Sequence, residues 1–88
     1  MPTWYIYILQ CSDNTLYTGI TTDLERRLHE HNHSPKGAKY TRARRPIVLV
    51  YSEPADCRST ASRREWELKQ LNATDKRQLI SAQSNKSG

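Results

Sequence analysis

The start of the chain contains two segments in which hydrophobic positions follow the period of a β-strand. Residues 4–11, WYIYILQC, are rich in β-branched and aromatic side chains, and residues 15–21, TLYTGIT, alternate between apolar and polar with a period of two. A polar turn sequence, SDN at residues 12–14, separates them. We therefore predict a β-hairpin.

The length of the turn determines which side chains share a face of this hairpin, because side chains alternate along each strand. A two-residue turn would pair Tyr7 with Ile20 and place Tyr7 and Tyr17 on opposite faces. A three-residue turn, with Asn14 in the left-handed conformation, pairs Tyr7 with Gly19 and places both tyrosines on one face. We favour the three-residue turn because it sorts the side chains chemically. One face then carries Trp4, Ile6, Ile8, Leu16, Thr18 and Ile20, and the other carries Tyr5, Tyr7, Leu9, Tyr17 and Gly19.

The next segment has the pattern of an amphipathic helix. The sequence TDLE is a capping box, in which Thr22 accepts the amide hydrogen of the third helical residue and Glu25 reaches back to the start of the helix. Leu24 and Leu28, four residues apart, mark the buried stripe of this helix. Arg27 and His31, also four apart, lie on an adjoining stripe, so we expect them to be neighbours.

Three further elements follow a basic segment. Residues 46–53, PIVLVYSE, form a near-continuous apolar run, which predicts a strand covered on both faces rather than an edge strand. Residues 59–71 and 73–82 have helical periodicity. The pattern predicts an α+β fold in the order β-β-α-β-α-α, with one domain over residues 1–82 and a disordered tail at residues 83–88.

The helix at residues 59–71 carries a carboxylate that leans toward its buried side. Ala61, Leu68 and Leu71 define the apolar arc, and Glu65 lies about 40° from Ala61 on a helical projection. Removing an ionised carboxylate from water is costly unless it is paired or coordinates a cation. Glu65 therefore has two interpretations. It forms a structural ion pair with Lys or Arg, or it is a metal ligand.

Charge favours a polyanionic partner. The chain has 14 Lys and Arg against 9 Asp and Glu, a net charge of +5. Residues 32–46 contain five cations and no acid, and these cations are Lys36, Lys39, Arg42, Arg44 and Arg45. The segment is either a solvated loop that serves solubility or a surface that contacts phosphate groups.

Cysteine usage and hydropathy exclude several other classes. Cys11 and Cys57 are too few and too unpatterned for a disulfide framework or a zinc knuckle, so we expect reduced thiols. The sequence has no basic signal-peptide start and no apolar run near the ~20 residues of a membrane span. We expect a cytoplasmic protein that does not bind a membrane.

The tyrosines of the hairpin are part of a larger pattern. YIY at residues 5–7 and YTG at residues 17–19 together resemble the paired tripeptides that name the GIY-YIG nuclease family. TTDLERR, which ends at Arg27, resembles the first helix of the family, and REWELKQL, which contains Glu65, resembles the later helix that carries its glutamate. The resemblance covers residues 4–80 and is greatest to the short stand-alone bacterial members. Departures are Tyr5 in the place of a glycine, Thr18 in the middle of the second tripeptide, and Ile20 where some relatives have a lysine.

The resemblance implies a three-stranded antiparallel sheet flanked by helices and a site that hydrolyses phosphodiester bonds with one divalent cation, Mg²⁺ or Mn²⁺. It places Tyr7 near the attacking water, Tyr17 as the second tyrosine, Arg27 at the scissile phosphate and Glu65 as the sole protein ligand of the metal. His31 matches a position where related nucleases have a histidine or tyrosine that assists proton transfer. Tyr7, with an ordinary pKa of ~10, and His31, with one of ~6.5, are alternative bases.

We expect a metal-dependent endonuclease that acts on DNA. One small domain offers little readout of base sequence, so its targeting would come from DNA structure, a protein partner or a dimer. A non-catalytic nucleic-acid-binding module with the same fold is the alternative, and a protein-interaction domain is a third hypothesis.

Overall fold

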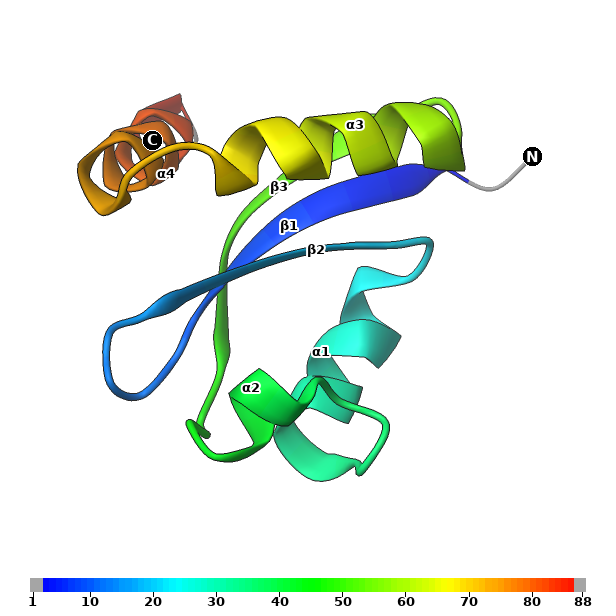
Figure 1. Ribbon diagram of the computed structural model, residues 1–88, viewed down its shortest axis with the longest axis vertical. Coiled ribbons are helices and arrows are strands. Elements are labelled where there is room, and N and C mark those ends of the chain that lie inside the picture. Colours follow the sequence, from blue (N-terminus) through cyan, green and yellow to red (C-terminus); the bar gives the residue numbers. More distant parts are fainter. Residues whose placement is uncertain (1–2, 87–88) are drawn as a thin grey trace.

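A three-stranded antiparallel sheet with helices on both sides forms the centre of the molecule (Figure 1). This structure is a computed structural model, and it describes residues 3–86. The strands β1 (Trp4–Gln10), β2 (Leu16–Thr21) and β3 (Val48–Ala55) lie in the order β2-β1-β3. The helices are α1 (Leu24–His33), α2 (Lys39–Arg42), α3 (Arg58–Lys69) and α4 (Ala73–Lys86). The predicted α+β fold with an antiparallel sheet is confirmed.

The register of the hairpin is the one that a three-residue turn produces. Tyr7 pairs with Gly19, and the amide of Cys11 donates to the carbonyl of Thr15 at 2.9 Å. Asn14 has φ 68°, the left-handed conformation that asparagine adopts more easily than most residues. The predicted register is therefore confirmed, and Tyr7 and Tyr17 lie on one face.

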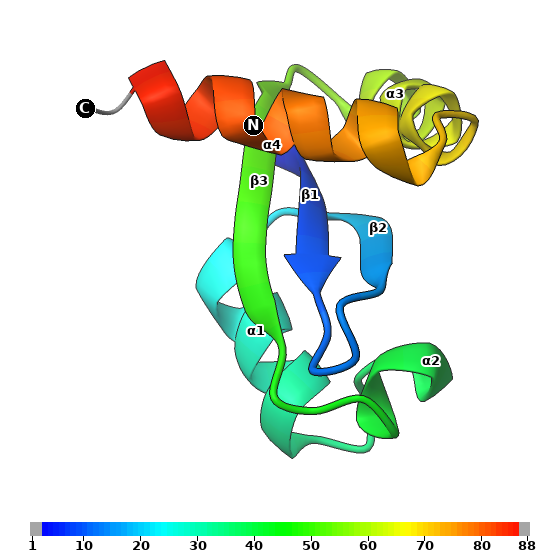
Figure 2. The same cartoon turned by 90° about the vertical axis from the view of Figure 1, so that its left-hand side faces the viewer.

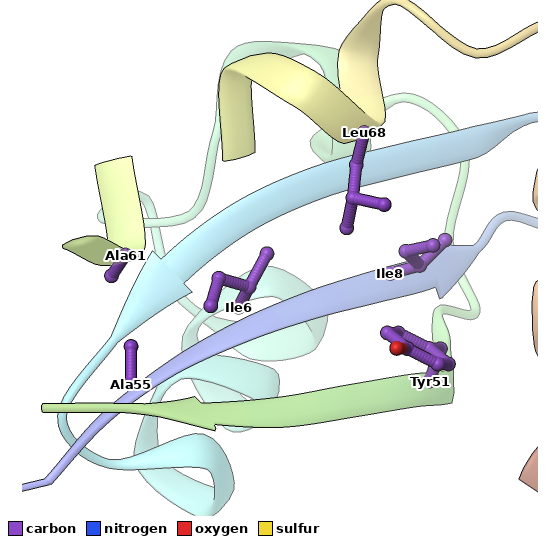
Figure 3. Close-up of a cluster of buried hydrophobic side chains, with 6 residues drawn as sticks. All are labelled: Ile6, Ile8, Tyr51, Ala55, Ala61 and Leu68. Carbon is purple, nitrogen blue, oxygen red and sulfur yellow. The ribbon is translucent and has the colours of Figure 1, made fainter. Parts of the chain in front are cut away.

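The two faces of the sheet pack against different helices. The first cluster consists of Ile6, Ile8, Tyr51, Ala55, Ala61 and Leu68, and it fills the space between the sheet and α3 (Figure 3). The second cluster lies on the opposite face and consists of Tyr7, Leu9, Cys11 and Ile47, with Tyr17 and leucines of α1 packed against it. Accordingly, α1 and α2 lie on the opposite side of the sheet from α3 and α4 (Figures 1 and 2). The alternation of apolar residues along β1 thus supplies two cores.

The prediction that the third strand is not an edge strand is wrong, whereas its predicted cover on both faces is present, since Tyr51 belongs to the first cluster and Leu49 packs against the second. β3 is at an edge of the sheet, and Val48 at its start is 57% exposed. The apolar run does not reveal the edge position, because α4 covers the outer edge of β3 and so allows apolar residues there. The side-chain amide of Gln83 accepts from the Ser52 amide at 3.2 Å and donates to the Ser52 carbonyl at 2.7 Å. Pro54, two residues further along the same edge, has no amide hydrogen to leave unpaired.

The helix boundaries differ from the predicted ones in local ways. The N-cap of α1 is Asp23, whose carboxylate accepts from the Arg26 amide at 3.0 Å, so the predicted capping box at Thr22 is wrong by one residue. The Thr21 hydroxyl accepts from the Asp23 amide at 3.1 Å and so places the Asp23 side chain over the helix start. The basic segment contains α2, which the sequence did not predict. α4 runs to Lys86, so the tail predicted to be disordered, 83–88, lies partly within this helix and partly outside the described residues.

Candidate active site

Three aromatic rings meet on the face of the sheet that carries Tyr7 and Tyr17. The Tyr7 and His31 ring centroids are 5.9 Å apart, and those of Tyr17 and His31 are 5.4 Å apart, both with edge-on geometry. Tyr7 comes from β1, Tyr17 from β2 and His31 from α1. The hairpin register and the packing of α1 against this face therefore bring together three side chains that the sequence singled out.

Gly19 makes room for the Tyr7 side chain. A β-carbon at Gly19 would lie 2.5 Å from the Tyr7 hydroxyl oxygen and 2.6 Å from the ring carbon that carries it. Both distances are far inside van der Waals contact, so any larger residue would displace the ring. The glycine of the YTG tripeptide thus has a steric function for the tyrosine of the YIY tripeptide, which is its partner across the strands.

A buried chain of hydrogen bonds begins at Tyr7. The Tyr7 hydroxyl lies 3.0 Å from Nε2 of His31, and Nδ1 of His31 lies 2.8 Å from the Thr41 hydroxyl oxygen. The Thr41 hydroxyl donates to the Ala38 carbonyl at 2.9 Å. His31 and Thr41 are fully buried, and Tyr7 is 2% exposed. Thr41 was not predicted as a site residue, because it lies in a helix of only four residues within the basic segment.

Burial keeps both ends of the Tyr7–His31 hydrogen bond uncharged at neutral pH. Desolvation raises the pKa of Tyr7 to about 12, against a lowering influence of Arg27, while Tyr17 and Glu65 raise this pKa to a smaller extent. Desolvation and then the Arg27 charge lower the pKa of His31 to about 4. His31 therefore does not titrate near its ordinary value of ~6.5, and at pH 7 it is a neutral acceptor.

Arg27 lies beside Tyr7 and is held by two partners. One of its guanidinium nitrogens donates to Glu30 at 3.0 Å and to the Lys36 carbonyl at 2.9 Å. Arg27 and Tyr7 line the same small hollow together with leucines of β1, α1 and β3. The Arg27 side chain is 27% exposed, so part of the guanidinium faces solvent. Glu30, which orients it, went unnoticed in the sequence, although its position three residues after Arg27 is typical of a helical ion pair.

Glu65 forms its ion pair with a residue outside the other four predicted site residues. Its carboxylate lies 3.4 Å from Nζ of Lys69, one turn later in α3, and 25% of its side chain is exposed. Among the described residues, no hydrogen bond or ion pair joins it to the tyrosines, Arg27 or His31. Its charge nevertheless raises the pKa of Tyr7. The ion pair that the sequence offered as one interpretation is present, but an exposed helical pair of this kind contributes only ~0.3–0.5 kcal/mol.

A single carboxylate restricts the kind of metal that the site fits. Within residues 3–86 no group of three or more His, Cys, Asp and Glu side chains is arranged to hold an ion. Mg²⁺ commonly binds through one or two carboxylates and retains several waters, with substrate phosphates completing its coordination. Glu65 alone therefore fits a hydrated Mg²⁺ or Mn²⁺ better than a metal that needs a protein cage.

The five cations of the basic segment divide into two groups. Arg45 donates to the carbonyls of His31 at 2.7 Å and Ser34 at 2.9 Å, so it closes the end of α1. Arg44 pairs with Asp13 in the hairpin turn at 3.1 Å. The remaining three, which are exposed and form no ion pair in the described part of the chain, are Lys36, Lys39 and Arg42.

Tyr40, which lies between Lys39 and Thr41, fixes α2 against the site. The Tyr40 ring stacks on the Tyr17 ring, with centroids 6.0 Å apart and planes inclined by 25°. The Arg44 guanidinium lies 3.9 Å from the centroid of the Tyr40 ring. This stack places α2, and with it two of the exposed cations, beside the three rings of the site.

Comparison with known proteins agrees with this arrangement. A family model described as the GIY-YIG catalytic domain matches residues 3–78. The chain belongs to the GIY-YIG family. The family is of the nuclease type, and the predicted family membership is confirmed.

Relatives of this GIY-YIG protein match most of its length. A UPF0213 protein of Desulfotalea psychrophila is 59% identical over 81 residues, which are 92% of this chain and 74% of the relative. A UPF0213 protein of Staphylococcus haemolyticus is 50% identical over 80 residues, 91% of this chain and 96% of the relative. The solution structure of a UPF0213 protein from Bacillus halodurans has 46% identity and a TM-score of 0.58, and the match covers 91% of this chain and 84% of that one. These names state no activity.

Over residues 3–86, no helix is both long enough and apolar enough to cross a membrane. Both cysteines are free, with Cys11 buried in the second cluster and Cys57 exposed.

Proposed function

We propose that this protein is a metal-dependent endonuclease that hydrolyses phosphodiester bonds in DNA. The observation that carries the proposal is the buried hydrogen bond between Tyr7 and His31 beside Arg27, because it joins a proton-transferring pair to a phosphate-binding group. Membership of a nuclease-type family supports it. The resemblance assigns the same residues to the reaction.

Tyr7 and His31 act together as the base. A water next to Tyr7 loses a proton to the phenolic oxygen while the phenolic hydrogen moves to Nε2 of His31. The oxygen of that water forms a bond to phosphorus, the bond from phosphorus to the leaving oxygen breaks, and the leaving oxygen takes a proton from solvent. His31 then returns its proton through Tyr7 to solvent, which balances the proton that the leaving oxygen took. In this scheme Tyr17 packs against the His31 ring and keeps it in place.

The pKa values require that these proton movements accompany the attack. The pKa of Tyr7 exceeds that of His31 by about 8, and each pKa unit corresponds to about 1.4 kcal/mol. Before the attraction between the two charges is counted, a preformed phenolate–imidazolium pair would therefore cost on the order of 10 kcal/mol in the resting site. A substrate phosphate bound to Arg27 offsets the Arg27 charge, which is the second cause of the low pKa of His31, and so makes His31 a stronger base.

Arg27 and Glu65 compensate the negative charge of the phosphate, Arg27 directly and Glu65 through the cation that it would hold. The planar guanidinium of Arg27 donates to non-bridging phosphate oxygens, and Glu30 and the Lys36 carbonyl hold it in position. Glu65 would hold the divalent cation, Mg²⁺ or Mn²⁺, which supplies Lewis-acid stabilisation when bound. The exposed cations Lys36, Lys39 and Arg42 bind the DNA backbone on either side of the scissile bond. A protein partner or the structure of the DNA provides the targeting.

A non-catalytic nucleic-acid-binding module is the second candidate, and the Lys69–Glu65 ion pair favours it. The two functions are separated by Glu65→Gln, with Lys69→Gln as the matched control that breaks the same ion pair but keeps the carboxylate. For a nuclease, Glu65→Gln abolishes metal-dependent cleavage and leaves metal-free DNA binding equal or slightly tighter, whereas Lys69→Gln retains cleavage. Arg27→Ala loses both cleavage and binding.

The assay uses branched, nicked, single-stranded and duplex DNA with Mg²⁺ or Mn²⁺, together with melting temperatures. Cleavage that survives Glu65→Gln would overturn the metal-ligand assignment. Wild-type protein that binds but cleaves none of these substrates would establish the binding module instead.

A further inference from the structure

The hydrogen-bond chain behind Tyr7 extends one residue beyond the groups that the reaction uses. Tyr7, His31 and Thr41 contribute three hydrogens to this chain, and the Ala38 carbonyl ends it. The Ala38 carbonyl also accepts the amide hydrogens of Thr41 and Arg42 at 3.1 Å each, so the turn of α2 fixes its position. Because the chain is buried, each hydrogen must find its acceptor within the protein when no substrate and no attacking water are bound.

A count of donors and acceptors determines which ring nitrogen of His31 carries the hydrogen. If Nδ1 is protonated, Nδ1–H donates to Thr41, the Thr41 hydroxyl donates to Ala38, and the Tyr7 hydroxyl donates to Nε2, so all three hydrogens have acceptors. If Nε2 is protonated instead, it donates to the Tyr7 oxygen, and the Tyr7 hydrogen has no acceptor within the described residues. An unpaired buried hydroxyl costs about 1–3 kcal/mol.

Arg27 adds an independent reason. It lies beside the Tyr7 hydroxyl and affects its pKa, and a guanidinium has only donors to offer. The lone pairs of the Tyr7 oxygen therefore face Arg27, and its hydrogen faces His31. This orientation is possible only when Nε2 of His31 is free to accept.

We propose that Thr41 is a positioning residue that holds His31 in the Nδ1–H tautomer, so that Nε2 can accept the proton of Tyr7. Thr41 does not touch the substrate. Its catalytic consequence rests on the proposed nuclease function, whereas the tautomer itself can be measured without any activity. Lys39 and Arg42 flank Thr41 in α2, so the turn that presents cations to DNA also orients the proton acceptor.

Three variants test this proposal. Thr41→Val keeps the shape of the side chain and removes the hydroxyl, Thr41→Ser keeps the hydroxyl, and Tyr7→Phe removes the other hydrogen-bond partner of His31. The charged and titratable groups around the ring, which the threonine variants leave unchanged, are Arg27, Glu30, Arg45, Tyr7 and Tyr17.

The first measurement is the tautomer of His31 in metal-free protein, from long-range proton–nitrogen NMR correlations of the ring. We expect Nδ1–H in the wild type, in Thr41→Ser and in Tyr7→Phe, and a mixture with Nε2–H in Thr41→Val, where one buried hydrogen lacks an acceptor in either tautomer. An Nε2–H ring in the wild type or in Tyr7→Phe overturns the proposal, and so does an unchanged ring in Thr41→Val. The wild-type and Tyr7→Phe spectra decide the question even if Thr41→Val does not fold.

The second measurement is the pH profile of kcat and KM. Thr41→Val should lower kcat with little change in KM, by less than the ~10⁴-fold that a wholly wrong tautomer of a catalytic histidine can cost. Thr41→Ser should restore kcat. A kcat that is unchanged in Thr41→Val despite an altered tautomer overturns the positioning role. Absence of cleavage in the wild type counts against the nuclease proposal alone, because the NMR result still decides the tautomer.

Discussion

At the scale of single residues, the site depends on a histidine that is fully buried and neutral. His31 could have been an exposed, titrating side chain, as its ordinary pKa of ~6.5 suggests. Instead, the Tyr7 hydroxyl and the Thr41 hydroxyl occupy its two ring nitrogens, and burial with the nearby Arg27 lowers its pKa to about 4. The proposed proton-transfer function and the stability of the protein are therefore coupled at this one side chain.

The low pKa of His31 predicts how stability depends on pH. The unfolded chain binds a proton near pH 6.5 and the folded chain only near pH 4, so stability is fully present above pH 6.5 and falls as pH decreases from 6.5 to 4. The full loss is about 3 kcal/mol. Urea unfolding at a series of pH values should show this slope between pH 6.5 and 5, above the range in which Glu30 and Asp13, whose pKa values are lowered, lose their contributions.

Two variants identify the group responsible. His31→Gln should remove the slope between pH 6.5 and 5, and His29→Gln, which changes an exposed histidine on the same helix, should retain it. A slope that persists in His31→Gln would show that another group titrates and that His31 is not the buried neutral residue described here.

At the scale of elements, predictions succeeded where one sequence period covered the whole element. The hairpin register followed from alternation along two strands and from an asparagine that tolerates a left-handed turn. α2 has four residues, too few for any helical period, so neither this helix nor the proposed role of Thr41 could be predicted from the sequence. The edge position of β3 could not be read from its apolar run, because the residue that covers the edge, Gln83, lies 31 positions away.

The contact between α4 and β3 predicts a protected strand edge. The Gln83 amide satisfies both the amide and the carbonyl of Ser52, and it thereby imitates a neighbouring strand. Gln83→Ala should expose these groups, lower stability by about 1 kcal/mol and speed hydrogen exchange at the Ser52 amide. Gln78→Ala, an exposed glutamine elsewhere on α4, is the control. Unchanged exchange at Ser52 would show that Gln83 does not protect the edge.

At the scale of the whole molecule, the sheet separates the larger apolar core on one face from the candidate site on the other. The face toward α3 and α4 holds the larger apolar cluster, which is shown in Figure 3. The face toward α1 and α2 holds the aromatic rings, Arg27 and the exposed cations, so the chemistry and the positive charge share one side. The family resemblance assigns Glu65 to this group; Glu65 comes from α3, which lies on the opposite side of the sheet, and its charge raises the pKa of Tyr7. Its assignment as a metal ligand stays a prediction.

This arrangement predicts that only some cations of the basic segment contribute to DNA affinity. Lys36, Lys39 and Arg42 are exposed without ion pairs in the described structure, whereas the Arg45 guanidinium closes the end of α1. Each phosphate contact that is lost should reduce the slope of log affinity against log salt by about one on duplex DNA. Replacing the three exposed cations with glutamine should therefore flatten the slope by about three, which a fluorescence-anisotropy titration at several salt concentrations measures.

Two control variants separate charge from structure. Arg45→Gln should lower the melting temperature, because two carbonyls at the end of α1 lose their donor, and should change the salt slope little in the protein that remains folded. Lys76→Gln, on α4 at the far side of the sheet (Figure 2), should change neither quantity. A triple variant with the wild-type slope would exclude this face as the DNA-binding surface, whereas an equal effect of Lys76→Gln would mean that net charge alone governs binding. The expected pattern, a flatter slope from α2 and its flanks only, places the DNA backbone beside Arg27 and the Tyr7–His31 pair.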